Sequence, residues 1–135
     1  MNQPALRFMA TAPRGLADLA SRELRELGVE ELSERTAGVR FAGGLRAGYL
    51  ACLHSRVASR VLLEVADYEA GDTDGFYAGA RAVDWRAHVD PTGTLACEFT
   101  GAHPTITHSQ FGAQKLKDAI CDQLREASGA RPGIE

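Results

Sequence analysis

The stretch LRFMATAPRGLADLASRELRELGV, residues 6–29, predicts a strand, a tight turn and a helix. Residues 6–11 are mostly apolar, and the tripeptide Pro-Arg-Gly that follows at 13–15 is a turn signal. Leucine and alanine then recur at steps of three and four residues, which is the spacing of one apolar helix face. Gly28 comes directly after the last of these residues and predicts a left-handed C-cap. The stretch therefore predicts a helix that packs back onto the strand before it.

Four further elements are predicted as far as residue 68. Short strands at 29–36 and 39–42 are joined at Ala37 and Gly38, which form a hairpin signal. Apolar residues at helical spacing then mark a second helix: Leu45, Tyr49, Cys52 and Leu53. Residues 60–68 alternate in hydrophobicity and predict a last strand. The order βαββαβ is the ferredoxin-like plan, so residues 1–69 are predicted to form an α+β lobe of this kind.

Residues 70–135 predict a second lobe with the order α-β-α. Its helix at 76–83 follows a polar, glycine-containing link at 70–72. Alternating apolar residues at 94–100 predict one strand, and a long helix follows it. No strand is expected after this helix. Because a single strand cannot form a stable sheet, residues 70–135 are expected to be a C-terminally truncated lobe that lacks its later strands.

The long helix starts in the segment THSQFGAQKLKDAICD, residues 107–122, which holds the only two lysines of the chain. Thr107 and Gln110 fit a capping box, so the helix is expected to begin at about His108. Orphan N–H groups and the positive end of the helix dipole favour an anion there. The helix is expected to bury one stripe at steps of three and four: Ala113, Leu116, Ile120, Leu124 and Ala127.

The segment HSQFGAQKLKDAICD, residues 108–122, resembles the THUMP-domain signature of bacterial 23S ribosomal-RNA methyltransferases, specifically the large-subunit guanine-N2 family. Three more segments follow that family's pattern in order, at 9–29, 55–68 and 82–101. The resemblance implies an RNA-binding segment that presents large-subunit ribosomal RNA to a catalytic domain beyond residue 135. It also implies that the parent enzyme transfers a methyl group from S-adenosylmethionine to the guanine N2, and that this segment itself is non-catalytic.

The resemblance implies six RNA-binding residues around the start of the helix: His108, Ser109, Gln110, Phe111, Lys115 and Lys117. Successive helix residues are rotated by about 100°, so Lys115 and Lys117 lie roughly 160° apart on either side of the apolar stripe. Lys115 shares its side with His108 and Phe111, which favours phosphate contact by the lysine and base stacking by the aromatic ring. Lys117 is expected to extend from the edge of the stripe.

The net charge of −3 argues against strong, sequence-independent adhesion to nucleic acid, which needs many phosphate contacts. Residues 1–70 hold nine arginines and nine acids, whereas residues 71–135 hold six basic residues and nine acids. The lysine segment is therefore a small basic cluster in an acidic half. The sequence predicts RNA contact that depends on local geometry.

Neither a metal nor a cofactor is expected in this segment. Glycine-rich nucleotide loops are absent, and so is the acidic-Pro-Pro-aromatic motif of amino-methylating enzymes. The histidines lack zinc-type spacing, and Cys52, Cys97 and Cys121 are expected to be buried, reduced thiols. The chain has no run of 18 apolar residues and no secretory leader, so it is expected to be cytoplasmic.

Two other functions are compatible with a ferredoxin-like lobe. An acylphosphatase-like hydrolase could use Arg14 in a phosphate cradle. Enzymes of that type also need an asparagine to orient water, and the only one here is Asn2. A regulatory module that binds a small metabolite is the other alternative, and a ligand-dependent change in melting temperature would favour it.

Overall fold

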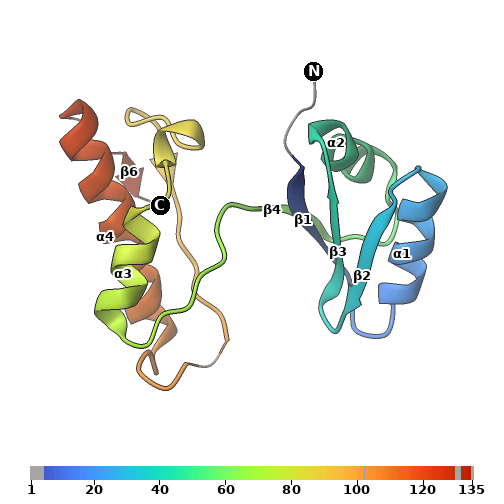
Figure 1. Cartoon of the computed structure of the whole chain (residues 1–135), viewed down its shortest axis with the longest axis horizontal. Coiled ribbons are helices and arrows are strands. Elements are labelled where there is room, and N and C mark those ends of the chain that lie inside the picture. Colours follow the sequence, from blue (N-terminus) through green and yellow to red (C-terminus); the bar gives the residue numbers. More distant parts are fainter. Residues whose placement is uncertain (1–4, 102, 130–131, 135) are drawn as a thin grey trace. The chain divides into compact units, whose positions relative to one another are not determined.

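The computed structural model describes residues 5–101, 103–129 and 132–134. The chain forms two compact units, Met1–Val65 and Ala66–Glu135, and each is described here by itself (Figure 1). The first unit contains β1 (Leu6–Thr11), α1 (Ala17–Glu26), β2 (Glu31–Arg35), β3 (Gly38–Gly43), α2 (Leu45–His54) and β4 (Arg60–Glu64). The second contains α3 (Thr73–Arg81), the 3₁₀ turn η1 (Trp85–Ala87), β5 (Thr94–Leu95), α4 (Ser109–Ser128) and β6 (Gly133–Ile134).

The four strands of the first unit form an antiparallel sheet in the order β2-β3-β1-β4. With its two helices this arrangement is the ferredoxin-like fold, as the sequence predicts. Two predicted turn glycines have positive φ angles. Gly28 has φ +89° directly after α1, and Gly38 at the β2–β3 hairpin has φ +149°. Both values lie in the region that favours glycine over residues with a Cβ.

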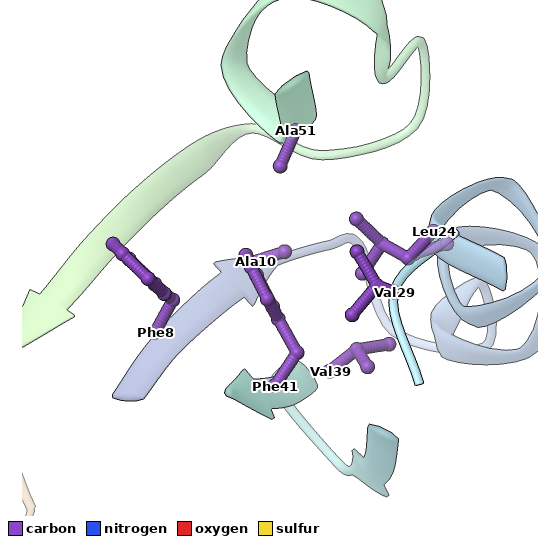
Figure 2. Packing of buried hydrophobic residues seen from close by; sticks show 8 residues of the cluster. Phe8, Ala10, Leu24, Val29, Val39, Phe41 and Ala51 are labelled. Atoms are coloured by element: carbon purple, nitrogen blue, oxygen red, sulfur yellow. The ribbon is translucent and has the colours of Figure 1, made fainter. Parts of the chain in front are cut away.

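The core of this unit lies on the sheet face that bears Phe8 and Ala10 of β1. Their direct partners across the β1–β3 pair, Phe41 and Val39, share that face, and the Phe8 and Phe41 rings stack with centroids 5.2 Å apart. Leu24 of α1 and Ala51 of α2 pack against the same residues (Figure 2). Both helices therefore cover one face of the sheet, and no helix among the described residues of this unit lies on the opposite face.

The helix α2 forms where the sequence predicts it, but its large apolar residues face solvent. Tyr49 is 66% exposed and Leu53 is 77% exposed. The residues that α2 buries are Gly48 and Ala51. A Cβ on Gly48 would lie 2.7 Å from the Phe8 ring, so only a small residue lets the helix approach the sheet. Cys52 is also exposed and Cys97 is only partly buried, so the prediction of buried thiols is correct for Cys121 alone.

The strand β4 ends earlier than predicted. Its last paired residue is Glu64, which lies opposite Arg7 of β1. Residues 65–68 pair with no strand among the described residues. The alternation of apolar residues continues past Glu64, but alternation without a partner does not make a ladder.

Glu23 ties α1 to the segment after α2. Its carboxylate accepts hydrogen bonds from Ser55 Oγ at 2.7 Å and from the backbone N–H groups of Arg56 and Val57 at 3.0 and 3.4 Å. The Ser55 hydrogen bond is the largest of the effects that lower the pKa of Glu23 below its ordinary value of 4.5. A lowered folded pKa means that folding favours the ionised carboxylate. The resulting stability is present above pH 4.5 and is lost as the pH falls through the folded pKa.

We predict that Glu23→Gln lowers the free energy of unfolding by about 0.5–1 kcal/mol at pH 7, because the side chain is only partly buried. The difference from the wild-type chain should shrink below pH 4.5, where the carboxylate takes up a proton. Urea unfolding at neutral and acid pH measures both values. A difference that does not change with pH would contradict the role given to the charge.

The second unit is built on α3 and α4, which pack side by side (Figure 1). Asp72 caps α3 by accepting a hydrogen bond from Gly75 N at 2.7 Å. At the other end, the Gln123 amide of α4 accepts from Trp85 N at 2.9 Å and donates to Arg81 O at 2.6 Å. One side chain of α4 thus pairs with a carbonyl at the end of α3 and with the backbone N–H at the start of η1.

Two strand predictions in this unit need correction. The strand predicted at 94–100 is limited to Thr94 and Leu95, which pair in parallel with Gly133 and Ile134. Residues 96–100 still alternate between exposed and partly buried side chains, but no strand among the described residues pairs with them. The pairing also shows that a short strand, β6, does follow α4. Residues 102, 130 and 131 lie outside the described residues, as does Asn2.

Candidate functional site

The helix α4 begins at Ser109, with His108 as its N-cap in extended backbone. Its first hydrogen bond runs from Gly112 N to His108 O at 3.1 Å. No side chain caps this end, so the predicted capping box of Thr107 and Gln110 is wrong. Because the N-cap lies one residue later than predicted, Gln110 occupies the second helical position and not the third. Residues 107–111 are all exposed, and no side-chain acceptor among the described residues covers this end.

The first turn of α4 forms one wall of a groove of about 410 Å³. Ser109 and Gln110 line it together with Ala113, and residues 97–100 form the opposite wall. Phe99 reaches α4 because position 112 is glycine, where a Cβ would lie 2.4 Å from Phe99 Cγ. The groove therefore offers hydroxyl and amide groups beside an aromatic ring. Glu98 also lines it, and its charge disfavours a phosphate inside.

Lys115 lies on the side of α4 that faces α3. Its Nζ is 5.8 Å from the centroid of the Phe111 ring and 6.0 Å from that of Tyr77, so the ammonium group lies near two aromatic rings. The Tyr77 hydroxyl donates a hydrogen bond to Asp122, and this bond is the main reason why the pKa of Tyr77 is raised. Phe111 remains 42% exposed. An oriented cation and an accessible ring therefore lie together on the first two turns of α4, on the side that faces α3.

Lys117 lies on the other side of α4. Its Nζ is 3.2 Å from Asp118 Oδ1, and its side chain is only 21% exposed. Burial raises the pKa of the Cys97 thiol, the nearby Cys121 raises it further, and the positive charge of Lys117 opposes the rise. The two lysines thus extend in the directions that helical projection predicts, one toward α3 and one toward the segment that contains Cys97. Lys117 is largely enclosed and paired with an acid.

The buried face of α4 agrees with the predicted stripe only in part. Ile120 and Leu124 are buried as predicted, whereas Ala127 is exposed near the end of the helix. The other buried residues of α4 are Gly112, Ala119 and Cys121. The contacts that align α3 with α4, such as the ion pair of Arg81 with Glu126, are absent from the sequence prediction. Arg81 and Glu126 are 45 positions apart in the sequence, and the spacing of neighbouring residues does not predict such a pair.

The described residues contain no group of three or more His, Cys, Asp or Glu side chains arranged to hold a metal ion. Within the same part of the chain, no helix is both long enough and apolar enough to cross a bilayer. Arg14, the residue on which a hydrolase would depend, is exposed in the turn after β1. His103 orders the loop before α4, since its Nε2 lies 2.8 Å from Ala70 O and its Nδ1 accepts from Thr105 N.

Comparison with protein families assigns both units. Residues 7–62 match the family model of the RlmL ferredoxin-like domain, and residues 70–135 match that of the THUMP domain. The chain belongs to these two families. The RlmL ferredoxin-like match coincides with the antiparallel sheet and its two helices, and the THUMP match contains α3, α4 and the groove between α4 and residues 97–100.

The curated relatives are ribosomal RNA large subunit methyltransferases K/L. The protein of Ectopseudomonas mendocina is 48% identical over 128 residues, which are 95% of this chain and 18% of the relative. That of Methylococcus capsulatus is 46% identical over 127 residues, 94% of this chain and 17% of the relative. The chain therefore spans less than a fifth of the length of the relatives it matches.

Solved structures share the fold of the RlmL ferredoxin-like and THUMP units. A crystal structure of a protein from Listeria monocytogenes, provisionally assigned as an N6-adenine-specific DNA methylase, has a TM-score of 0.84 at 22% identity and covers 96% of this chain and 36% of its own. A protein provisionally assigned as a methyltransferase and complexed with SAH has a TM-score of 0.83 at 21% identity, covering 97% and 34%. At these identities the likeness concerns the fold alone.

Proposed function

We propose that the chain is the RNA-binding segment of an S-adenosylmethionine-dependent ribosomal-RNA methyltransferase that modifies the N2 of a guanine in large-subunit RNA. The curated relatives support the reaction class, since they are ribosomal-RNA methyltransferases that match at least 94% of this chain. In this proposal the RlmL ferredoxin-like lobe comprises residues 1–69 and the THUMP domain comprises residues 70–135. Together they present large-subunit ribosomal RNA to a catalytic domain of the same polypeptide in the cytoplasm.

The observation that carries the proposal is the exposed start of α4, which presents the groove on the side of residues 97–100 and Phe111 with Lys115 on the side that faces α3. Serine hydroxyl and glutamine amide groups can hydrogen-bond to base edges, and an exposed phenylalanine ring can stack on an unpaired base. Lys115 lies beside that ring and can contact the phosphate of the same nucleotide. Because the charge of Glu98 disfavours a phosphate in the groove, we infer that base edges enter the groove and that phosphate contacts Lys115 on the side of α4 that faces α3.

His108 and Lys117 take smaller parts in the proposed site. His108 is exposed as the N-cap of α4 but does not line the groove. Lys117 is partly buried and lies beside Asp118, so its charge is offset where RNA would approach. We therefore rank Lys115 above Lys117 as the phosphate contact.

We assign S-adenosylmethionine to the rest of the polypeptide. The four-stranded sheet of this chain is antiparallel and offers no crevice at the carboxyl ends of parallel strands, where nucleotide-type cofactors bind in open α/β sheets. The cofactor supplies the methyl group when bound in the parent enzyme. The residues of this chain bind and orient the RNA in this proposal.

We predict that Lys115→Ala weakens RNA binding by about three- to tenfold, because it removes a phosphate contact that is already oriented by two rings. The plot of log Kd against log salt should lose roughly one unit of slope. Lys117→Ala is the matched control, since it removes the same charge from the same helix, and it should change both values less. Fluorescence anisotropy with a labelled ribosomal-RNA hairpin over a salt series measures these effects. Equal losses for the two variants would refute the ranking of the lysines.

A further inference from the structure

The two units carry opposite net charges. Residues 1–65 contain nine basic residues and seven acids, a net charge of +2, whereas residues 66–135 contain six basic residues and eleven acids, a net charge of −5. Long-range attraction to a polyanion is therefore weak or unfavourable at the THUMP unit and favourable at the ferredoxin-like unit. The location of the positive charge within the first unit decides where a polyanion would approach.

The sheet of the first unit has one face without a helix, which we call the open face. Directly paired residues of neighbouring strands share a face, so Arg7, Met9 and Thr11 of β1 define it, opposite to the core residues Phe8 and Ala10. Residues that pair across the four strands form three rows on this face, each written in the order β2, β3, β1, β4. The rows are Glu31, Ala42, Arg7 and Glu64; Ser33, Arg40, Met9 and Leu62; and Arg35, Gly38, Thr11 and Arg60.

All of the net positive charge of the first unit lies on the open face. The face carries four of the nine arginines of residues 1–65 but only two of the seven acids, and the remaining charges of the unit cancel. The four arginines are spread over all three rows, and the last row has an arginine at each end and no acid. This distribution makes a broad basic surface on a chain that is acidic as a whole.

The ion pairs of the open face leave most of this charge uncompensated. Glu64 accepts two hydrogen bonds from Arg40 Nη2 at 2.7 and 2.6 Å and lies 3.6 Å from Arg7 Nη1, so one carboxylate serves two guanidinium groups. Arg35 and Arg60 are exposed and have no ion pair within the described part of the chain. A hollow of about 280 Å³ lies beside the first two rows, and its lining includes Arg7, Arg40, Glu31, Ser33 and Ala42 of the open face together with Leu32 and Phe41.

The chemistry of this face fits a phosphate backbone better than bases. It carries no aromatic side chain, and its largest apolar residues are Met9 and Leu62, so stacking on unpaired bases is not available. Guanidinium groups recognise phosphate through charge-assisted hydrogen bonds. We propose that the open face is a second RNA-contact surface, which binds the RNA backbone without reading sequence. This inference rests on the proposed RNA-binding function and adds a surface separate from α4.

The test compares arginines from the two sides of the first unit in the full 135-residue chain. Arg35→Ala with Arg60→Ala should weaken binding to a fluorescein-labelled RNA hairpin by on the order of tenfold at low salt and lower the salt slope by about two units. Arg22→Ala with Arg46→Ala removes the same charge from the exposed surfaces of α1 and α2 and should have a much smaller effect. A hairpin of scrambled sequence should respond in the same way, because backbone contacts carry no sequence information.

Replacing an acid of β2 by lysine tests whether added positive charge on the open face strengthens RNA binding. Glu31 and Glu34 are both exposed on β2, but Glu31 lies on the open face and Glu34 on the other face. Glu31→Lys should strengthen binding more than Glu34→Lys, since the Debye length at physiological salt is only about 8 Å. A substitution that only disturbed the fold would not strengthen RNA binding.

The outcomes separate this inference from the proposed function. If Lys115→Ala weakens binding while the open-face variants match their controls, the open face is not an RNA surface and the proposed function stands. If the wild-type chain does not bind the hairpin even at low salt, both fail. Far-UV circular dichroism of every variant excludes loss of fold as the cause of weaker binding.

Discussion

Phe41→Ala is expected to lower the free energy of unfolding of the ferredoxin-like unit by about 3–5 kcal/mol. Phe41 is 2% exposed and stacks on Phe8 in the middle of the sheet. Its removal deletes buried ring contacts and leaves a cavity between the sheet and the two helices. Ala10 and Ala51, which belong to the same core cluster, are too small to fill it. Such a loss is comparable to the whole stability of a small unit.

Leu53→Ala is the matched control for this prediction. Leu53 has a comparable apolar side chain in the same unit but is 77% exposed, so its replacement should cost less than about 0.5 kcal/mol. Urea unfolding followed by far-UV circular dichroism measures both variants, and amide hydrogen exchange in β1 and β3 localises the loss. Equal costs for Phe41 and Leu53 would show that the unit does not have the core described here.

The plan of the first unit is predictable from sequence because its signals are local. The Pro-Arg-Gly turn, the C-cap at Gly28 and the hairpin at Gly38 each depend on a few adjacent residues. What the sequence could not predict is which side of α2 packs inward. Hydrophobicity favours burial of Tyr49 and Leu53, but the helix lies so close to Phe8 that only Gly48 and Ala51 fit. Close approach is a tertiary constraint and overrides the apolar pattern.

The candidate site was predictable only in outline. The sequence places a helix start and two lysines at the right positions, and their projection onto opposite sides follows from helix geometry alone. The groove beside Ser109 depends on residues 97–100, which the sequence predicts as a strand. Their alternating burial is real, but a strand also needs a partner, and hydrophobic alternation carries no information about one. Tyr77, the second ring beside Lys115, comes from another helix and has no local signal.

Gly112→Val is expected to cost about 2–3 kcal/mol and to disrupt the groove. A Cβ at position 112 would lie 2.4 Å from Phe99 Cγ, close to the root of that side chain, so rotation of the ring cannot relieve the clash. Overpacking of this kind costs about 1–3 kcal/mol, and valine gains little helix propensity over glycine in compensation. Because Phe99 lines the groove with Ser109 and Gln110, its displacement should also weaken RNA binding.

A double-mutant cycle tests whether the clash with Phe99 is the cause. Phe99→Ala alone removes a ring that packs edge-on against Phe76 at 5.7 Å, and it should destabilise the THUMP unit. In the double variant the valine enters the space that the ring leaves. The double variant should therefore lose less stability than the sum of the two single variants, by at least about 1 kcal/mol. If the two losses of stability add, the clash with Phe99 is not the cause of the destabilisation by Gly112→Val. The double variant should regain stability but not RNA affinity, because the groove would still lack its aromatic wall.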